Sequence, residues 1–250
     1  MSSRRAGVAP LALALLLSAC ASVKAPAGEP HPQDPLERFN RRTFAFNESL
    51  DRHALKPMAE AYQSVVPAPV REAVGNVFGN LSDAWSALSW LLQGQVQRGL
   101  EQGARVAWNT TLGLGGLFDV SSHFGLEKRS QDLGQTLGAW GVGLGPYVVL
   151  PVLGPSSARD AAVLPLTRSL SLTSFVSGDG EKAGAVMLEA VSTRASVLSA
   201  EKIVSGIALD KYTFFRDAYL QRRSAKARKA EDDEGFEIVA PEPAASASGK

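Results

Sequence analysis

The chain has 250 residues, of which 45% are hydrophobic and 20% are charged, a composition typical of a globular protein. Its 26 Lys and Arg residues nearly balance its 25 Asp and Glu residues, and the formal net charge is +1 at pH 7. Nucleic-acid binding needs a concentrated basic face, so this balance gives no support for it.

The N-terminus is typical of a secretory signal peptide. Arg4 and Arg5 precede an apolar run from Leu11 to Leu17, which is too short to span a membrane as a mature helix. The end of this region resembles the bacterial lipobox, in which the cysteine becomes the acylated mature N-terminus; its residues are Leu17, Ser18, Ala19 and Cys20. Removal of residues 1–19 takes away two arginines and no acid, so the formal net charge changes from +1 to −1.

Cys20 is the only cysteine, which excludes a disulfide within the chain. A free thiol would be a liability in an oxidising compartment, and acylation would remove it. Ala21 follows the cysteine, where lipoproteins retained at the inner membrane usually have Asp, so this resemblance favours the outer membrane. Residues 20–33 are predicted to be the acylated N-terminus and a Pro- and Ala-rich tether.

Helical patterns fill most of the chain after the tether. Asp34 is predicted to cap a first helix, with Pro35 and Glu37 in its first turn. Prolines separate the shorter helices that follow, and the segment Asn80 to Gln93 is apolar most of the way round, which is typical of a central helix or of one that faces lipid. The helices expected in this part are Met58 to Val66, Val70 to about Val77, Asn80 to Gln93 and Gln95 to Asn109.

Glycine-rich apolar segments occupy the middle of the chain. Residues 110–120 and 133–158 flank a charged segment, Ser121 to Gln131, which we interpret as a polar loop or short hairpin. No charged residue occurs from Leu133 to Ala158, but its glycines and prolines exclude a regular spanning helix. Such a segment is either a buried loop in a soluble core or irregular backbone at membrane depth that other protein covers.

The C-terminal part is predicted to hold further helices. Glu181 to Ala200 and Glu201 to Leu209 have helical patterns, Pro165 interrupts the region before them, and Asp210 is predicted to cap a last helix. Residues 224–250 are rich in charged residues, Pro, Ala and Ser, and we predict that they form a disordered tail. Strand-like alternation is scarce, so the fold class is expected to be all-α, with a short glycine-rich hairpin or loop.

Signals for enzymatic chemistry are poor. His31, His53 and His123 are isolated from other residues at metal-ligand spacing, so neither a metal site nor a cofactor is predicted. No G-x-S-x-G sequence occurs, which leaves a hydrolase nucleophile without support. The run Gly141 to Gly145 lacks the Lys and Ser or Thr of a nucleotide-binding loop, and Pro146 follows it. The sequence therefore favours a protein that is not an enzyme.

Behind the lipobox, a series of short motifs resembles the MlaA (VacJ) family of outer-membrane lipoproteins. The similarity extends from about Asp34 to Arg223, and its order and spacing are specific. The motifs are Asp34-Pro35-Leu36-Glu37, Phe39-Asn40-Arg41, Phe46-Asn47, Asn80-Leu81, Leu91-Leu92-Gln93-Gly94, Asn109, Gly113 to Asp119, Asp132 to Gly138, Gly141 to Tyr147, Leu150-Pro151, Gly154-Pro155-Ser156, Arg159-Asp160, Tyr212 and Arg216 to Arg223.

This resemblance implies a ring-shaped, all-helical domain over residues 34–223 that lies in the outer membrane of a Gram-negative bacterium, anchored by lipid on the periplasmic side. It implies an amphipathic channel through which phospholipid from the outer leaflet reaches a soluble periplasmic carrier, so that the membrane stays asymmetric. It also implies association with a trimeric porin. A structural lipoprotein that scaffolds a porin or envelope complex, without lipid transfer, remains an alternative, and a periplasmic lipase is a third.

By the same resemblance, Ser121 to Gln131 is the loop that gates the channel, with Glu127, Lys128 and Arg129 as its charged residues. The flanking glycines would be hinges, or equally would allow close helix packing; they are Gly113, Gly115, Gly116, Gly134 and Gly138. The candidates for a channel segment are Gly141, Gly143, Gly145, Pro146 and Tyr147.

Overall fold

The computed structural model describes residues 31–169, 178–201 and 209–234. The predicted signal peptide, the lipobox with Cys20, and the tether up to residue 30 lie outside this range. So do residues 202–208, which make up most of the predicted helix Glu201 to Leu209, and the end of the predicted tail, 235–250.

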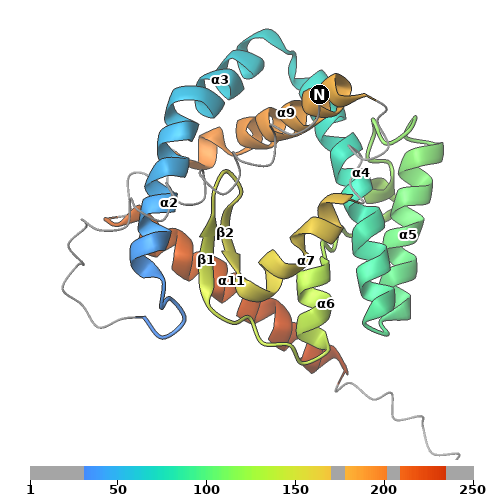
Figure 1. Ribbon diagram of the computed structural model, residues 1–250. Coiled ribbons are helices and arrows are strands. Elements are labelled where there is room, and N and C mark those ends of the chain that lie inside the picture. The colour runs from blue at the N-terminus through green and yellow to red at the C-terminus, as the bar shows by residue number, and fades with distance from the viewer. Residues whose placement is uncertain (1–30, 170–177, 202–208, 235–250) are drawn as a thin grey trace, which may run out of the picture.

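The helices form a ring, which confirms the predicted fold class (Figure 1). Contacts between neighbouring elements run from α3 to α9, α4, α6, α11, β2 and β1, and then back to α2. The bounds are α2 Glu37–Leu50, η2 Asp51–Leu55, α3 Lys56–Val65, α4 Ala68–Leu92, α5 Val96–Thr111, η3 Ser121–Phe124, α6 Leu133–Ala139, β1 Tyr147–Leu150, β2 Gly154–Ser157, α7 Ala158–Ser169, α9 Asp179–Ser196 and α11 Lys211–Glu234.

Prolines interrupt fewer helices than predicted. The π-helical turn η2 directly precedes Pro57, so α2, η2 and α3 form one continuous helical rod. A proline ring clashes with the carbonyl four residues earlier, and a widened turn at that point relieves the clash. Pro69 lies in the first turn of α4, where its missing N–H costs nothing, and α4 joins the two helices predicted before and after Gly79. Pro165 lies inside α7 rather than ending it.

Two predicted boundaries are wrong. Asp34 does not cap the first helix, because α2 begins at Glu37 and has no side-chain cap. The carboxylate of Asp34 is instead buried, and it accepts hydrogen bonds from Asn40, Tyr212 and Arg216. At the other end, α11 continues to Glu234, well past the predicted tail boundary at residue 223. The sequence there is rich in Ala, Arg, Lys and Glu, which have high helix propensity.

The uncharged stretch from Leu133 to Ala158, expected to be irregular backbone, contains a β-hairpin. Strands β1 and β2 pair antiparallel, with Tyr147 opposite Ser157 and Leu150 opposite Gly154. The other edge of β1 is covered by side chains of α2 rather than by a third strand. The amide of Asn40 donates to Tyr147 O at 3.0 Å and accepts from Val149 N at 2.8 Å.

Asn47, two helical turns further along α2, repeats this arrangement. Its amide donates to Leu150 O at 2.9 Å and accepts from Val152 N at 2.7 Å. Residues seven apart lie on one face of a helix, so both amides point at the hairpin, Asn40 at β1 and Asn47 at the end of β1 and the turn after it. Each amide bonds a carbonyl and the N–H two residues later, as a neighbouring strand would, and the hairpin needs no further strand.

The last helix closes the ring against the hairpin and α6. Tyr212 and Leu220 pack with Tyr147 and Val149 in one buried cluster. Beside it, Arg223 bridges the carboxylates of Asp132, at 2.7 Å, and Asp160, at 3.1 Å. The hydroxyl of Tyr219 donates to Asp160, and burial together with this bond raises the pKa of Tyr219 to about 12.

Asp210 caps α11, as predicted, and this gives a testable pH dependence. Its carboxylate accepts from Tyr212 N and from Arg41, and the bond from Arg41 is the largest cause that lowers the pKa of Asp210 from 3.8 to about 2. The charged form therefore stabilises the fold above the unfolded pKa, and this contribution is lost as the pH falls from about 5 to about 2.

We expect Asp210→Asn to be less stable than the wild type at neutral pH, with a difference that shrinks towards about pH 3, where the wild-type carboxylate begins to lose its charge. Urea unfolding in detergent at both pH values measures this. A difference that does not change with pH would contradict the role of the charge.

Candidate functional site

The predicted gating segment, Ser121 to Gln131, lies along the pair of helices α4 and α5. Gln102 donates to Glu127 O at 2.9 Å and accepts from Arg129 N at 3.2 Å, so a third helical amide holds an extended backbone in the way that Asn40 and Asn47 do. Ser86 bonds both backbone groups of Gln131. The segment is thus fastened to both helices near its C-terminal end.

A buried ionic cluster fastens its N-terminal end. The side chain of Arg105 is 1% exposed, and it donates to Asp83 at 3.3 Å and to both carboxylate oxygens of Asp119, at 3.1 and 3.0 Å. It also donates to Leu126 O and to the hydroxyl of Ser122. One guanidinium therefore joins α4, α5 and the segment.

The carboxylate of Asp119 is held in its charged form. Burial raises the pKa of Asp119, but hydrogen bonds from Ser122, Ser121, Asn109 and Arg105 outweigh burial and hold the pKa well below its usual value. On the other side of the cluster, Lys128 forms an ion pair with Asp83 at 3.2 Å. Two cations and two carboxylates face each other, so the cluster is electrically balanced.

The glycines before this segment form a tight turn. Gly115 and Gly116 have φ values of 75° and 92°, which side chains rarely adopt. A Cβ at Gly113 would overlap Phe118 O and Asn109 O, and one at Gly116 would lie 2.9 Å from the amide of Asn80. Turn geometry and close packing account for these three glycines.

Gly134 and Gly138 allow α6 to approach the pair Arg159 and Asp160 closely. A Cβ at Gly134 would overlap the carboxylate of Asp160, and a Cβ at Gly138 would lie 2.5 Å from Arg159 Nη1. Neither glycine has a positive φ. The packing interpretation therefore accounts for both positions.

Gly134→Ala is expected to lower the free energy of unfolding by about 1–3 kcal/mol, because the added methyl group displaces Asp160. Gly103→Ala is the matched control, since nothing lies within 4 Å of a Cβ at that position in α5. The control should be neutral or more stable by up to about 1 kcal/mol, because Ala has the higher helix propensity. Thermal unfolding in detergent measures both, and equal midpoints for the two variants would refute the packing interpretation.

The five candidates for a channel segment lie in different environments in the structure. Tyr147 has no exposed surface and belongs to the core cluster, so it does not line an open path. Pro146 O accepts from Ala158 N at 2.9 Å, at the base of the hairpin. The three glycines are in the backbone that connects α6 to the hairpin, and none of the five candidates lines the two pockets that follow; the glycines are Gly141, Gly143 and Gly145.

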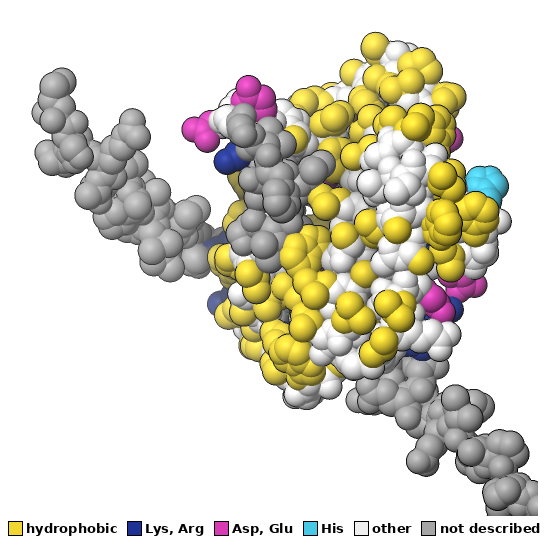
Figure 2. All heavy atoms as spheres, turned by 90° about the vertical axis from the view of Figure 1, so that its right-hand side faces the viewer, with side chains coloured by type: hydrophobic (Ala, Val, Ile, Leu, Met, Phe, Trp, Pro, Cys, Tyr) yellow, Lys and Arg dark blue, Asp and Glu magenta, His cyan; other side chains and the backbone are white. Residues whose placement is uncertain are grey.

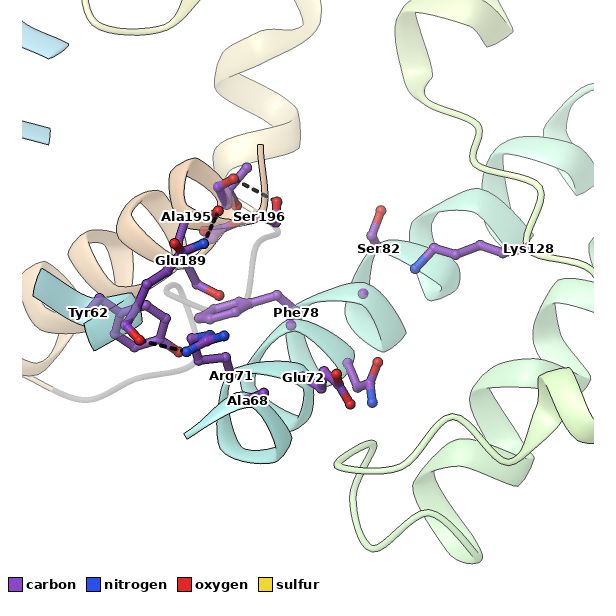
Figure 3. Close-up of a pocket in the computed structure, with 16 residues that line it drawn as sticks. Tyr62, Ala68, Arg71, Glu72, Phe78, Ser82, Lys128, Glu189, Ala195 and Ser196 are labelled. Carbon is purple, nitrogen blue, oxygen red and sulfur yellow. Dashed lines mark hydrogen bonds between the residues drawn. The ribbon is translucent and has the colours of Figure 1, made fainter. Parts of the chain in front are cut away.

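The larger pocket, of about 600 Å³, lies where α3, α4 and α9 meet (Figure 3). Its wall is mixed: Phe78 extends from α4 towards α9, and the charged groups are Arg71, Glu72, Glu189 and Lys128. Lys128 is thus the predicted gate residue that reaches a pocket. The sequence did not single out Arg71, Glu72 or Glu189, because isolated charges in amphipathic helices look like ordinary solvated residues.

A second pocket, of about 440 Å³, lies between α2, the hairpin and α9. Phe44, Pro155 and Phe215 give it an apolar wall. Its charged residues are paired with one another: Arg194 with Asp51 at 2.7 Å and with Glu201 at 2.5 Å, and Lys211 with Glu48 at 2.8 Å. Ion pairs of this kind fix the walls and offer little charge to a ligand.

Large hydrophobic side chains are exposed on several helices, among them α2, α4 and α5. Figure 2 shows them spread over the face formed by α4 and α5, with few charged groups. The rings of Trp108 and Phe124 contact each other at a tilt of 55° with their centroids 5.6 Å apart, and both side chains are more than 40% exposed. Among residues 31–169, 178–201 and 209–234, no helix has the length and hydropathy to cross a membrane. Exposed apolar surface of this extent marks a contact with lipid or protein.

The described part of the chain contains no group of three or more His, Asp or Glu residues that would hold a metal ion. Two titratable clusters consist of cations paired with carboxylates; one holds Arg105 and Lys128 with Asp83 and Asp119, and the other holds Arg159 and Arg223 with Asp132 and Asp160. Their geometry accounts for stability of the fold.

Comparison with known proteins gives one consistent family. The model of the family described as MlaA lipoprotein matches residues 32–226. An Escherichia coli protein named intermembrane phospholipid transport system lipoprotein MlaA is 34% identical over 202 residues, which cover 79% of this chain and 80% of that protein. The Haemophilus influenzae protein of the same name is 31% identical, with 85% and 86% covered, and an uncharacterized Rickettsia bellii protein is 35% identical over 78% and 77%.

A solved structure agrees with these relatives. It is described as the structural basis for maintenance of bacterial outer membrane lipid asymmetry, and it is 36% identical to this chain with a TM-score of 0.68. The match covers 78% of this chain and 98% of the solved one. The overall fold is therefore a known one, and the chain belongs to the MlaA lipoprotein family.

Proposed function

We propose that this lipoprotein acts in intermembrane phospholipid transport, removing mislocalised phospholipid from the outer leaflet of the outer membrane and passing it to a soluble periplasmic carrier. The observation that carries the proposal is a helical ring with an apolar rim and a mixed polar and apolar pocket of about 600 Å³. The names of its Escherichia coli and Haemophilus influenzae relatives support the same role.

The exposed side chains of α5 and of the turn after it suit burial among acyl chains. Val96, Leu100 and Trp108 on α5, and Leu112 and Phe118 after it, are all exposed hydrophobic residues. Removing such side chains from water contributes about 25 cal/mol per Å² of apolar area. The ring would then lie in a leaflet rather than across the bilayer, with residues 1–19 removed, Cys20 acylated and residues 20–33 as the tether on the periplasmic side.

Ser121 to Gln131 is proposed to gate the lipid path, with Lys128 at the wall of the larger pocket. The bonds of Gln102 to the backbone of Glu127 and Arg129 hold the segment against α5. Opening must therefore break this clamp or carry α5 with it. Downhill movement of lipid needs no nucleotide, so the protein is proposed to work without catalysis and to depend on a porin for its place in the membrane.

Co-purified lipid tests the transport role against the scaffold role. Mass spectrometry of the detergent-purified protein should find bound phospholipid and an N-terminal Cys20 that carries a thioether-linked diacylglycerol and an amide-linked acyl chain. A scaffold that only contacts a porin would carry no phospholipid in molar proportion, and release of lyso-phospholipid from added vesicles would indicate a lipase. Either result would contradict the proposal.

Gln102→Ala tests the gate. Freeing the backbone of residues 127 and 129 should change the amount of phospholipid in the outer leaflet of cells that carry the variant, while the protein stays in the membrane fraction. Gln97→Ala is the matched control, because Gln97 is an exposed glutamine on the same helix that bonds Glu101 rather than the segment. Surface phospholipid equal to wild type in Gln102→Ala cells would count against the gate.

A further inference from the structure

We propose that the pocket between α3, α4 and α9 selects phospholipids with a zwitterionic headgroup: Arg71 binds the phosphate, and Glu72 and Glu189 bind the ammonium. This inference rests on the proposed transport of phospholipid and adds the headgroup class. The three residues come from α4 and α9, whose contact also closes the ring, so the site is part of the fixed scaffold (Figure 3).

One edge of the Arg71 guanidinium is fixed by hydrogen bonds to the protein, and the other edge is available to a ligand. Its Nη1 donates to Gln63 O at 2.8 Å and to Val66 O at 2.7 Å, the carbonyls at the end of α3. Nε and Nη2 make no hydrogen bond to any residue that the structure describes. These two nitrogens form the edge with which a guanidinium binds a phosphate through two parallel hydrogen bonds. The orientation is fixed before any ligand arrives.

Glu72 and Glu189 line the same pocket and form neither an ion pair nor a hydrogen bond within the described residues. This sets them apart from the charged residues of the second pocket, which are paired with one another. Two carboxylates without partners beside one arginine give the pocket a local charge of −1. A headgroup with an ammonium is attracted to this arrangement, and a lipid with a net negative charge is repelled.

The pocket also has room and an apolar wall. A volume of about 600 Å³ is within the range of small-molecule sites. Phe78 and Ala68 supply apolar surface next to the charged groups, which suits the glycerol and first methylene groups of a lipid (Figure 3). Lys128, on the opposite wall, is already paired with Asp83, so its charge is balanced without a ligand.

A competition between two lipids tests the headgroup class. The purified protein is incubated with mixed micelles of equal phosphatidylethanolamine and phosphatidylglycerol, repurified, and its bound lipid is quantified by mass spectrometry. Wild type should retain phosphatidylethanolamine in about threefold to tenfold excess, as two solvent-accessible ion pairs provide. The double variant Glu72→Gln, Glu189→Gln should bring the ratio close to one, whereas Arg71→Lys should lower the binding of both lipids.

Glu60→Gln is the matched control, since Glu60 is an exposed carboxylate of α3 outside the pocket. Its lipid ratio should equal that of wild type. An unchanged ratio in the double variant would overturn the headgroup inference and leave transport intact. Absence of both lipids from every form of the protein, wild type included, would overturn the proposed function itself.

Discussion

Arg105→Met is expected to lower the free energy of unfolding by about 3–5 kcal/mol, because it leaves the buried carboxylate of Asp83 with a single, half-exposed cationic partner. The same change removes the bonds of Arg105 to Asp119 and to the carbonyl of Leu126, so the N-terminal part of the segment from Ser121 to Gln131 should loosen from α5. Thermal unfolding in detergent measures the first effect. Faster tryptic cleavage at Lys128 and Arg129 measures the second.

Arg38→Met controls for the loss of an arginine, since Arg38 is exposed on α2 and makes no ion pair with the described residues. It should unfold within about 0.5 kcal/mol of wild type. Adding Asp83→Leu to Arg105→Met removes the stranded carboxylate and should recover part of the loss. An Arg105→Met protein as stable as the Arg38→Met protein would show that the cluster does not hold the segment.

Asn40→Asp is the second change with a large expected effect, about 3 kcal/mol or more of lost stability. The wild-type amide donates to Asp34 and to Tyr147 O, and neither bond survives when the donor becomes a carboxylate. The new charge also faces Asp34, which is 1% exposed. The unfolding midpoint in urea measures this loss.

Asn47→Asp is the graded comparison, because Asn47 makes the same two kinds of bond to the hairpin in a partly exposed position. Water can solvate its carboxylate, so we expect a cost of about 1 kcal/mol. Equal costs at positions 40 and 47 would mean that burial beside Asp34 is not what makes the first substitution damaging.

Local sequence patterns predicted the helices well, and the errors have physical causes. Apolar periodicity placed α5, α9 and the start of α11, where Asp210 acts as the predicted cap. Pro57 was expected to separate two helices, but a π-helical turn absorbs it. The position of the hairpin was missed because its edge partner is a pair of asparagine side chains on α2, and strand prediction assumes a neighbouring strand.

The site depended on contacts between distant parts of the chain. Lys128 was singled out as a charged residue between glycine-rich arms, and the structure places it at a pocket wall. Arg71 and Glu189 are more than a hundred positions apart, and nothing local joins them. One sequence signal for the hairpin contact was available. Asn40 and Asn47 are seven residues apart on a predicted helix, and this spacing puts two amides on one face, where they need a polar partner.

The two ends of the described chain meet at one point of the ring, where Tyr212 donates to Asp34 across 178 positions of sequence. The carboxylate of Asp34 can form this bond only after most of the polypeptide, up to Tyr212, has been synthesised. Contacts between residues so far apart in sequence form slowly, and hydrophobic surface stays exposed to solvent until they form. We therefore expect folding of this protein to be completed late, when α11 has been made and can pack against the N-terminal part of the ring.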